Sequence, residues 1–211
     1  MQNPIKLDFK KSEKEYYQPK KLSIINVPPM NFITIDGWGA PADASFQTAI
    51  SQLYPVAYAI SMSYKKEERL IKDFVPFVVP PLEGLWTSKL PPENEYLDKS
   101  ALIWKIMLRL PDFVSADDVE WAKAEAAIKK KIDCSAVKFE QITDGLCVQA
   151  LHVGSFDNEP ATFDKMVKFA AEQGVQPVHR DFHHREIYIS DFRKTAPEKL
   201  KTVLRLFVEK K

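Results

Sequence analysis

Residues 183–191 read HHREIYISD and combine several proton-carrying side chains with the isoleucines and tyrosine typical of a β-strand. Strand side chains alternate between faces, so His184, Glu186 and Tyr188 should share one face, while Arg185 and Ile187 share the other. We expect the isoleucine face to be the core that the helices cover. Glu186 would then face either water, which is the simpler alternative for an arbitrary strand, or a cleft.

A glutamate beside a tyrosine and histidines could perform general acid–base chemistry. A carboxylate that is desolvated among aromatic rings would act as a base toward water, a role typically worth ~10²–10⁴-fold in rate. Tyr188 could donate a hydrogen bond to a developing negative charge. His152 is another candidate donor, although a histidine between Leu151 and Val153 is more often a hydrogen-bonded core residue. The candidate catalytic residues are therefore Glu186, Tyr188 and His152.

Aromatic side chains could form the walls of such a cleft. Trp38 lies between Gly37 and Gly39, where no periodic pattern gives a reason for burial, so a ligand or cleft wall is favoured. Trp86 and Trp104 lie in strand-like segments and could equally belong to the core. The candidate ligand-binding residues are Trp38, Tyr58, Trp86, Trp104 and His184, and Tyr58 is the weakest because a helical tyrosine is as often core.

The elements that would position these residues occur twice. Residues 32–60 and 147–174 each read as an apolar strand, a glycine, a polar loop and an amphipathic helix. Gly37 precedes Phe46 by the same spacing as Gly154 precedes Phe163. The hydroxyl residue before each phenylalanine, Ser45 or Thr162, would cap its helix. Two strand-like segments follow each helix, at residues 73–86 and 101–110 and at residues 183–191 and 202–210.

The predicted fold is therefore α+β, a duplicated strand-helix-strand-strand module. Repeat one spans about 30–111 and repeat two about 137–211, with the helices on one side of the sheets. A helix at about 115–131 links them, because Ser115 and Asp118 form a capping box and lysines end the segment. Residues 1–29, with interleaved lysines and acids, are expected to be a solvated tail or lead-in.

Composition argues against several classes of function. The 211 residues carry a formal net charge of +1, so nothing predicts a nucleic-acid partner, and without a long apolar run we expect no membrane association and a cytoplasmic location. Cys134 and Cys147 lack C-x-x-C spacing and should be structural thiols. We expect no metal, because His183 and His184 point to opposite faces and converge poorly with His179. No cofactor is expected either, since only His152 or His184 could serve as an axial haem ligand.

Four segments in order, PLEGLW, CVQALHVG, HHREIYISD and APEKLKTVLR, resemble the stand-alone members of the GyrI-like small-molecule-binding family. The resemblance covers roughly residues 30–209. It implies two halves related by a pseudo-twofold axis that enclose an aromatic-lined ligand cleft, within a domain of residues 30–211. It also implies that Glu186 is the position associated with ligand charge or catalysis. Phe192 departs from the pattern, because a proline is expected in that turn.

Three functions remain open at this stage. The family includes hydrolases that open the ring of cyclopropanoid alkaloids such as yatakemycin, effector-binding domains of transcription regulators, and gyrase-inhibitory proteins. The sequence therefore predicts binding of a small planar aromatic ligand, with hydrolysis of cyclopropanoid-type electrophiles as the first hypothesis. The alternatives are a non-catalytic module that binds cationic aromatic compounds and a gyrase-inhibitor-like protein, whose protein partner is unknown. A glutamate in an aromatic cleft suits the first two equally.

Overall fold

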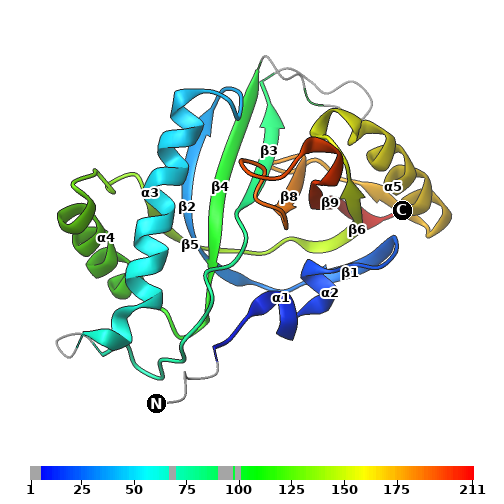
Figure 1. Cartoon of the computed structure of the whole chain (residues 1–211). Coiled ribbons are helices and arrows are strands. Elements are labelled where there is room, and N and C mark those ends of the chain that lie inside the picture. Colours follow the sequence, from blue (N-terminus) through cyan, green and yellow to red (C-terminus); the bar gives the residue numbers. More distant parts are fainter. Residues whose placement is uncertain (1–5, 67–69, 90–96, 98–100) are drawn as a thin grey trace.

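A computed structural model describes residues 6–66, 70–89, 97 and 101–211. Its strands form one antiparallel sheet in the order β1-β6-β9-β8-β3-β4-β2-β5, and β7 pairs with β9 (Figure 1). The strands are β1 (Ser23–Val27), β2 (Met30–Trp38), β3 (Glu83–Ser88), β4 (Leu102–Leu110), β5 (Lys138–Ile142), β6 (Gly145–Val153), β7 (Val175–Pro177), β8 (His184–Tyr188) and β9 (Lys201–Lys210).

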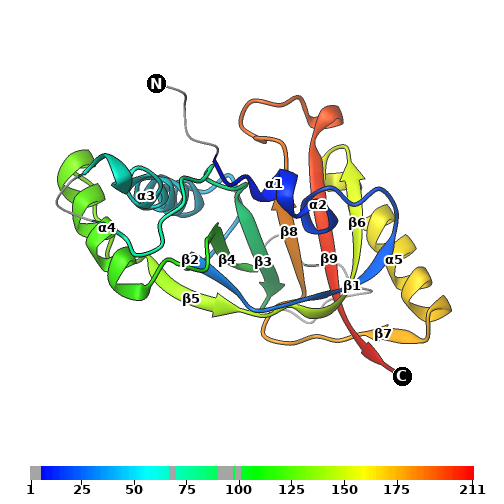
Figure 2. The same cartoon turned by 90° about the horizontal axis from the view of Figure 1, so that it is seen from below.

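Three longer helices accompany the sheet in the described part of the chain. Figure 1 shows α3 and α5 on either side of the central strands, and Figure 2 shows α4 beyond α3 at one end of the molecule. Two four-residue helices and three single 3₁₀ turns complete the described elements. The helices are α1 (Phe9–Ser12), α2 (Lys14–Tyr17), α3 (Ala44–Ser61), α4 (Ala116–Lys130) and α5 (Pro160–Glu172), and the turns are η1 (Ser63–Lys65), η2 (Phe156–Asn158) and η3 (Pro197–Lys199).

Strand pairing shows that the fold is duplicated, as the sequence predicted. β2, β4 and β3 of the first half correspond to β6, β9 and β8 of the second, and the halves meet where β3 pairs with β8. One row of cross-strand neighbours contains Ile35, Ile106, Gly84, Glu186, Leu204 and Ala150 in this order. The pseudo-twofold axis therefore passes between Gly84 and Glu186 at the centre of the sheet.

The predicted helices are present, and their apolar stripes are buried. α3 buries Phe46, Leu53 and Ile60 along its length, and α5 buries Phe163 and Met166. α4 begins at the predicted capping box, in which Ser115 and Asp118 bond reciprocally. α3 and α5 pack on the same face of the sheet as Glu186. They therefore form the side walls of the space above the central strands.

Three local predictions were wrong. Ser45 and Thr162 do not cap the helices, because α3 begins after Asp43 and α5 begins at Pro160. The first strand after α3 starts only at Glu83, since the preceding residues include prolines that cannot donate to a β-ladder. Strand register makes Gly39, not Gly37, the counterpart of Gly154, because both follow their strands directly and both have positive φ.

The N-terminal segment is part of the fold and not the expected solvated tail, although residues 1–5 lie outside the described residues. β1 pairs with β6 of the second half, while β5 pairs with β2 of the first, so each repeat sends a strand to the other's edge. Phe9 and Tyr17 are buried against Ile187 and Val203. The isoleucine face of β8 is thus covered by the N-terminal helices, whereas the helices of the repeats cover the glutamate face, contrary to the prediction.

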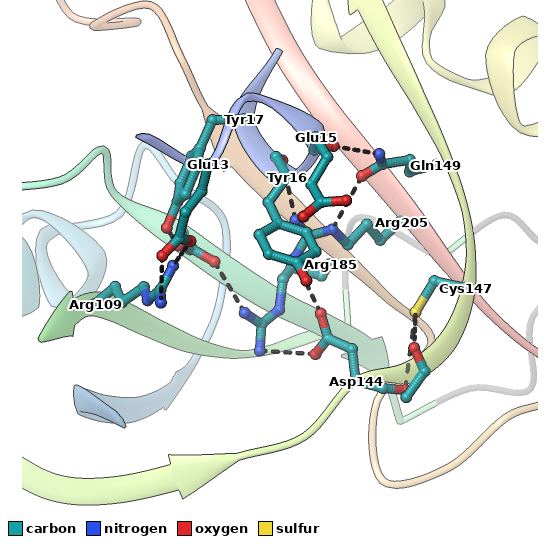
Figure 3. Close-up of polar contacts among 12 residues, drawn as sticks. Glu13, Glu15, Tyr16, Tyr17, Arg109, Asp144, Cys147, Gln149, Arg185 and Arg205 are labelled. Carbon is teal, nitrogen blue, oxygen red and sulfur yellow. Dashed lines mark hydrogen bonds and ion pairs between the residues drawn. The ribbon is translucent and has the colours of Figure 1, made fainter. Parts of the chain in front are cut away.

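A buried charged network lies beneath the central strands on the N-terminal side (Figure 3). Arg185 lies between Glu83, at 2.9 Å from Oε2, and Asp144, at 2.8 Å from Oδ1, and all three side chains are almost fully buried. Arg205 reaches Asp144 at 3.2 Å and donates to the carbonyl of Tyr16 at 2.9 Å. The network therefore ties β3, β8, β9 and the N-terminal segment together directly below Glu186.

Candidate functional site

A cavity of about 390 Å³ lies over the central strand pair, between the N-terminal ends of α3 and α5. Its floor comes from β3 and β8, and its walls come from the two loops that lead into the helices. This volume lies within the range of about 300–1,000 Å³ that is usual for small-molecule sites. The lining residues are Ala40, Pro41, Ala42, Phe46, Trp86, Leu97, Leu102, Ser155, Phe156, Asp157, Glu159, Pro160, Phe163, His184, Glu186, Tyr188 and Phe192.

Glu186 lies at the centre of the cavity floor. Its Oε1 lies 2.9 Å from Nε2 of His184, and the side chains of both residues are about nine-tenths buried. His184 also packs against the ring of Phe163, with centroids 4.7 Å apart. The imidazole therefore fixes the orientation of the carboxylate, while the rings around it limit access of bulk water.

Trp86 and Tyr188 lie beside Glu186 at equivalent positions of the two halves, each two residues beyond the axis. The indole Nε1 of Trp86 donates to the hydroxyl of Tyr188 at 2.9 Å. Burial raises the pKa of Tyr188 well above its ordinary value, and the negative charge of Glu186 and a hydrogen bond to it raise it further. Tyr188 therefore keeps its proton, and because the indole occupies a lone pair of the oxygen, the O–H donates to Glu186 in the protein without ligand.

Aromatic rings make up much of the walls. Phe156, Tyr188 and Phe192 contact one another edge to face, with centroids 5.4–6.1 Å apart. Phe46 and Phe163, the first stripe residues of α3 and α5, both line the cavity, Phe46 stacked on Trp86 and Phe163 packed against His184. Flat apolar surfaces on several sides suit a planar hydrophobic ligand.

The charged side chains that line the cavity in the described part of the chain are all acidic. Asp157 and Glu159 come from the loop before α5, and Glu186 from the floor. Glu159 is also close enough to raise the pKa of Tyr188 through its charge. The electrostatic potential in the cavity should therefore be negative.

The structure brings together four of the residues predicted from the sequence: Trp86, His184, Glu186 and Tyr188. Trp104 lies one layer behind, buried edge to face against Phe46 at 5.1 Å. It supports the wall and does not line the cavity.

The remaining three candidates lie elsewhere, which corrects the predicted site. Trp38 is 72% exposed outside the cavity. Tyr58, 54% exposed, stacks on Tyr54 in a neighbouring pocket between α3 and the segment after β8, which shares Tyr188 and Phe192 with the cavity. His152 is held by the hydroxyl of Thr162 at 2.9 Å and the carbonyl of Ser155 at 3.0 Å, so it stabilises the loop before α5 and does not line the cavity.

Sequence reasoning missed the residues of the two strand-to-helix loops. Pro41, Phe156, Asp157 and Glu159 line the cavity, although their segments carry no strand or helix periodicity. Their position was the available signal, because each follows the first strand of a repeat and precedes its helix. Phe192, noted only as a departure from the family pattern, also lines the cavity.

No group of three or more metal-binding side chains is present among the described residues. His179 and His183 stack on each other with centroids 3.8 Å apart, while His184 faces the cavity. Likewise, none of the helices that the structure describes has the length and hydropathy needed to cross a bilayer.

Comparison with known proteins identifies the fold and the class of site. Residues 20–208 match the GyrI-like small molecule binding domain. This chain belongs to that family. The family description agrees with an apolar cavity between two related halves, so the protein has a small-molecule-binding domain.

Solved structures similar to this GyrI-like protein extend the comparison. A hydrolase from Listeria innocua shares 43% identity over 97% of this chain and 100% of its own, with a TM-score of 0.88. A conserved protein from the same organism shares 44% identity over the same portions, with a TM-score of 0.89. The C-terminal domain of EcmrR, at 14% identity and a TM-score of 0.53 over 90% of this chain and 98% of its own, shows the fold alone. The comparison with curated proteins gave no match.

Proposed function

We propose that this protein binds a planar hydrophobic molecule in the cavity and hydrolyses it when it carries a cyclopropanoid-type electrophile. The observation that carries the proposal is the buried Glu186 carboxylate, which is oriented by His184 on the floor of an aromatic cavity. The 43% identical Listeria innocua hydrolase supports hydrolytic chemistry for this GyrI-like protein.

The residues present supply what such a reaction requires. In a cyclopropane conjugated to a dienone, water attacks a ring carbon and a ring C–C bond breaks. The electron pair of that bond passes to the carbonyl oxygen, which becomes a phenol after protonation. Glu186 would accept the proton of the attacking water, and the Tyr188 hydroxyl would exchange its hydrogen bond to Glu186 for one to the carbonyl oxygen of the bound substrate. Trp86 on the floor and the walls formed by Phe46 and Phe163 would hold the planar scaffold.

A second function is favoured by one specific observation. Asp157, Glu159 and Glu186 line the cavity, and no lysine or arginine of the described residues does. An aromatic cavity with this charge would bind planar cations by charge pairing and cation–π attraction without any chemistry. Under this alternative the protein sequesters its ligand.

Incubation with two matched sets of compounds distinguishes these functions. One set contains planar cyclopropanoid electrophiles and the other contains planar cations of similar size, with tryptophan quenching and product formation followed together. The hydrolase proposal predicts ring-opened product from the first set at a rate well above the rate without protein. Quenching by both sets without any product would reject it in favour of sequestration.

A further inference from the structure

The residue opposite Glu186 on the pseudo-twofold axis is Gly84, in the middle of β3. One half of the duplicated sheet thus places a carboxylate at the centre of the cavity floor, and the other half places no side chain there. Glycine inside a strand weakens it, and often marks a position where another group approaches the backbone closely. The cavity side of Gly84 has such a group.

The side chains that approach Gly84 are those of Trp86 and Tyr188. A Cβ added at Gly84 would lie 2.7 Å from Nε1 of Trp86, 3.3 Å from its Cε2 and 3.2 Å from the hydroxyl of Tyr188. The first distance is shorter than a carbon–nitrogen contact allows. Neither side chain can move away easily, because the indole and the hydroxyl are hydrogen-bonded to each other and both are buried. The indole–hydroxyl pair therefore lies across the backbone of Gly84, in space that any other residue would fill.

We infer that Gly84 is a specificity-determining positioning residue, which keeps the cavity floor flat beside Glu186 by letting the Trp86–Tyr188 pair lie over the central strands. This rests on the proposed ligand cavity, and it names the selected ligand shape: an extended planar ring system that fits the space left beside that pair. A side chain at position 84 would push the indole toward Phe46, which stacks on it with ring centroids 5.8 Å apart, and both rings line the cavity. It would also separate Nε1 from the Tyr188 oxygen, so that the hydroxyl would no longer be oriented.

Gly84→Ala, Trp86→Phe and the double variant test this inference. Phenylalanine lacks the Nε1 atom that an alanine Cβ would meet, so it should relieve the clash. The readouts are affinity for the planar tricyclic dye proflavine, the thermal midpoint, and the indole N–H cross-peak of Trp86 in a ¹⁵N spectrum, assigned by its loss in Trp86→Phe. Thr87→Ala, on the same strand but on the opposite face, is the matched control.

The expected result is a shifted Trp86 indole signal and dye binding weakened about tenfold or more in Gly84→Ala, with no change in Thr87→Ala. In the Trp86→Phe background the alanine should cost little further affinity. If Gly84→Ala does not fold, the double variant should restore folding. An unmoved indole signal, a full additional loss of affinity in the double variant, or failure of the double variant to fold would overturn the inference. None of these readouts requires turnover, so failure of the hydrolase proposal alone would leave them intact.

Discussion

At the scale of single residues, the site depends on one carboxylate with a defined partner on each side. His184 orients Glu186, and the Trp86–Tyr188 pair supplies a flat surface and an oriented hydroxyl. The alternation of side chains in HHREIYISD predicted which residues would share this face. The alternation could not predict which elements would cover each face of β8. Both faces are buried, the isoleucine face by the N-terminal helices and the glutamate face by the helices of the repeats.

Trp38 illustrates where residue-level reasoning failed. A tryptophan between two glycines suggested a ligand wall, but Trp38 is 72% exposed and does not line the cavity. We therefore expect Trp38→Ala to change affinity for a planar ligand by less than about twofold, whereas Trp86→Ala removes part of the cavity floor and the hydrogen bond to Tyr188, and should weaken binding about tenfold or more. Fluorescence titration of both variants measures this. A larger loss in Trp38→Ala than in Trp86→Ala would restore Trp38 to the site.

Buried tyrosines predict how stability depends on pH. The pKa values of Tyr188 and Tyr17 are both raised from the ordinary 10.0, in each case mainly by burial. Because the folded protein binds these protons more tightly than the unfolded chain, their contribution to stability is complete below pH 10 and is lost as the pH rises above it.

We expect the free energy of unfolding to fall as the pH rises above about 10, and to fall less steeply in Tyr188→Phe, which cannot ionise at this position. Urea unfolding at several pH values measures the slope. Equal slopes in the wild-type protein and in the variant would mean that Tyr188 titrates like an exposed phenol.

At the scale of elements, an ion-pair network on the opposite face of the sheet positions the strands that carry Glu186 and the other floor residues. Glu83 and Arg185 immediately precede Gly84 and Glu186, so they occupy equivalent positions and form an ion pair across the central strands. The turn between β5 and β6 adds Asp144 (Figure 3). This network fixes the β3–β8 register, on which the placement of every floor residue depends.

Arg185→Met should therefore destabilise the fold by about 3–5 kcal/mol, because it leaves two buried carboxylates without their common partner. Arg193→Met is the matched control. Arg193 pairs with Asp191 at 2.8 Å on the surface, so its loss should cost no more than about 1 kcal/mol. Urea denaturation compares the two variants. Equal costs would show that the buried network contributes no more than a surface pair.

Elements with strong periodicity were predictable, and short polar ones were not. The stripes of α3 and α5 and the capping box of α4 predicted those helices. β1 and β5 were missed because five-residue strands with mixed burial lack a clear alternation. α1 and α2 were missed because their lysines suggested solvent exposure, although Phe9 and Tyr17 are buried.

At the scale of the whole molecule, duplication explains both the shape of the cavity and its chemistry. Equivalent loops, helices and strands supply paired walls, which the repeat in the sequence could predict. The chemistry comes from the places where the halves differ: Gly84 against Glu186, and Leu82 against His184. Such differences at the axis become visible only after strand register is known, so spacing alone could not reveal them.

The central claim is that Glu186 acts on a ligand held in this cavity, and Glu186→Gln tests it most directly. Glutamine keeps the shape of the side chain but removes both base and charge, while Glu198→Gln, at an exposed glutamate outside the cavity, serves as control. With a planar cyclopropanoid substrate, we predict near-normal binding by calorimetry and a loss of turnover of about 10²-fold or more in Glu186→Gln, and wild-type values for both in Glu198→Gln. Wild-type turnover in Glu186→Gln would contradict the account.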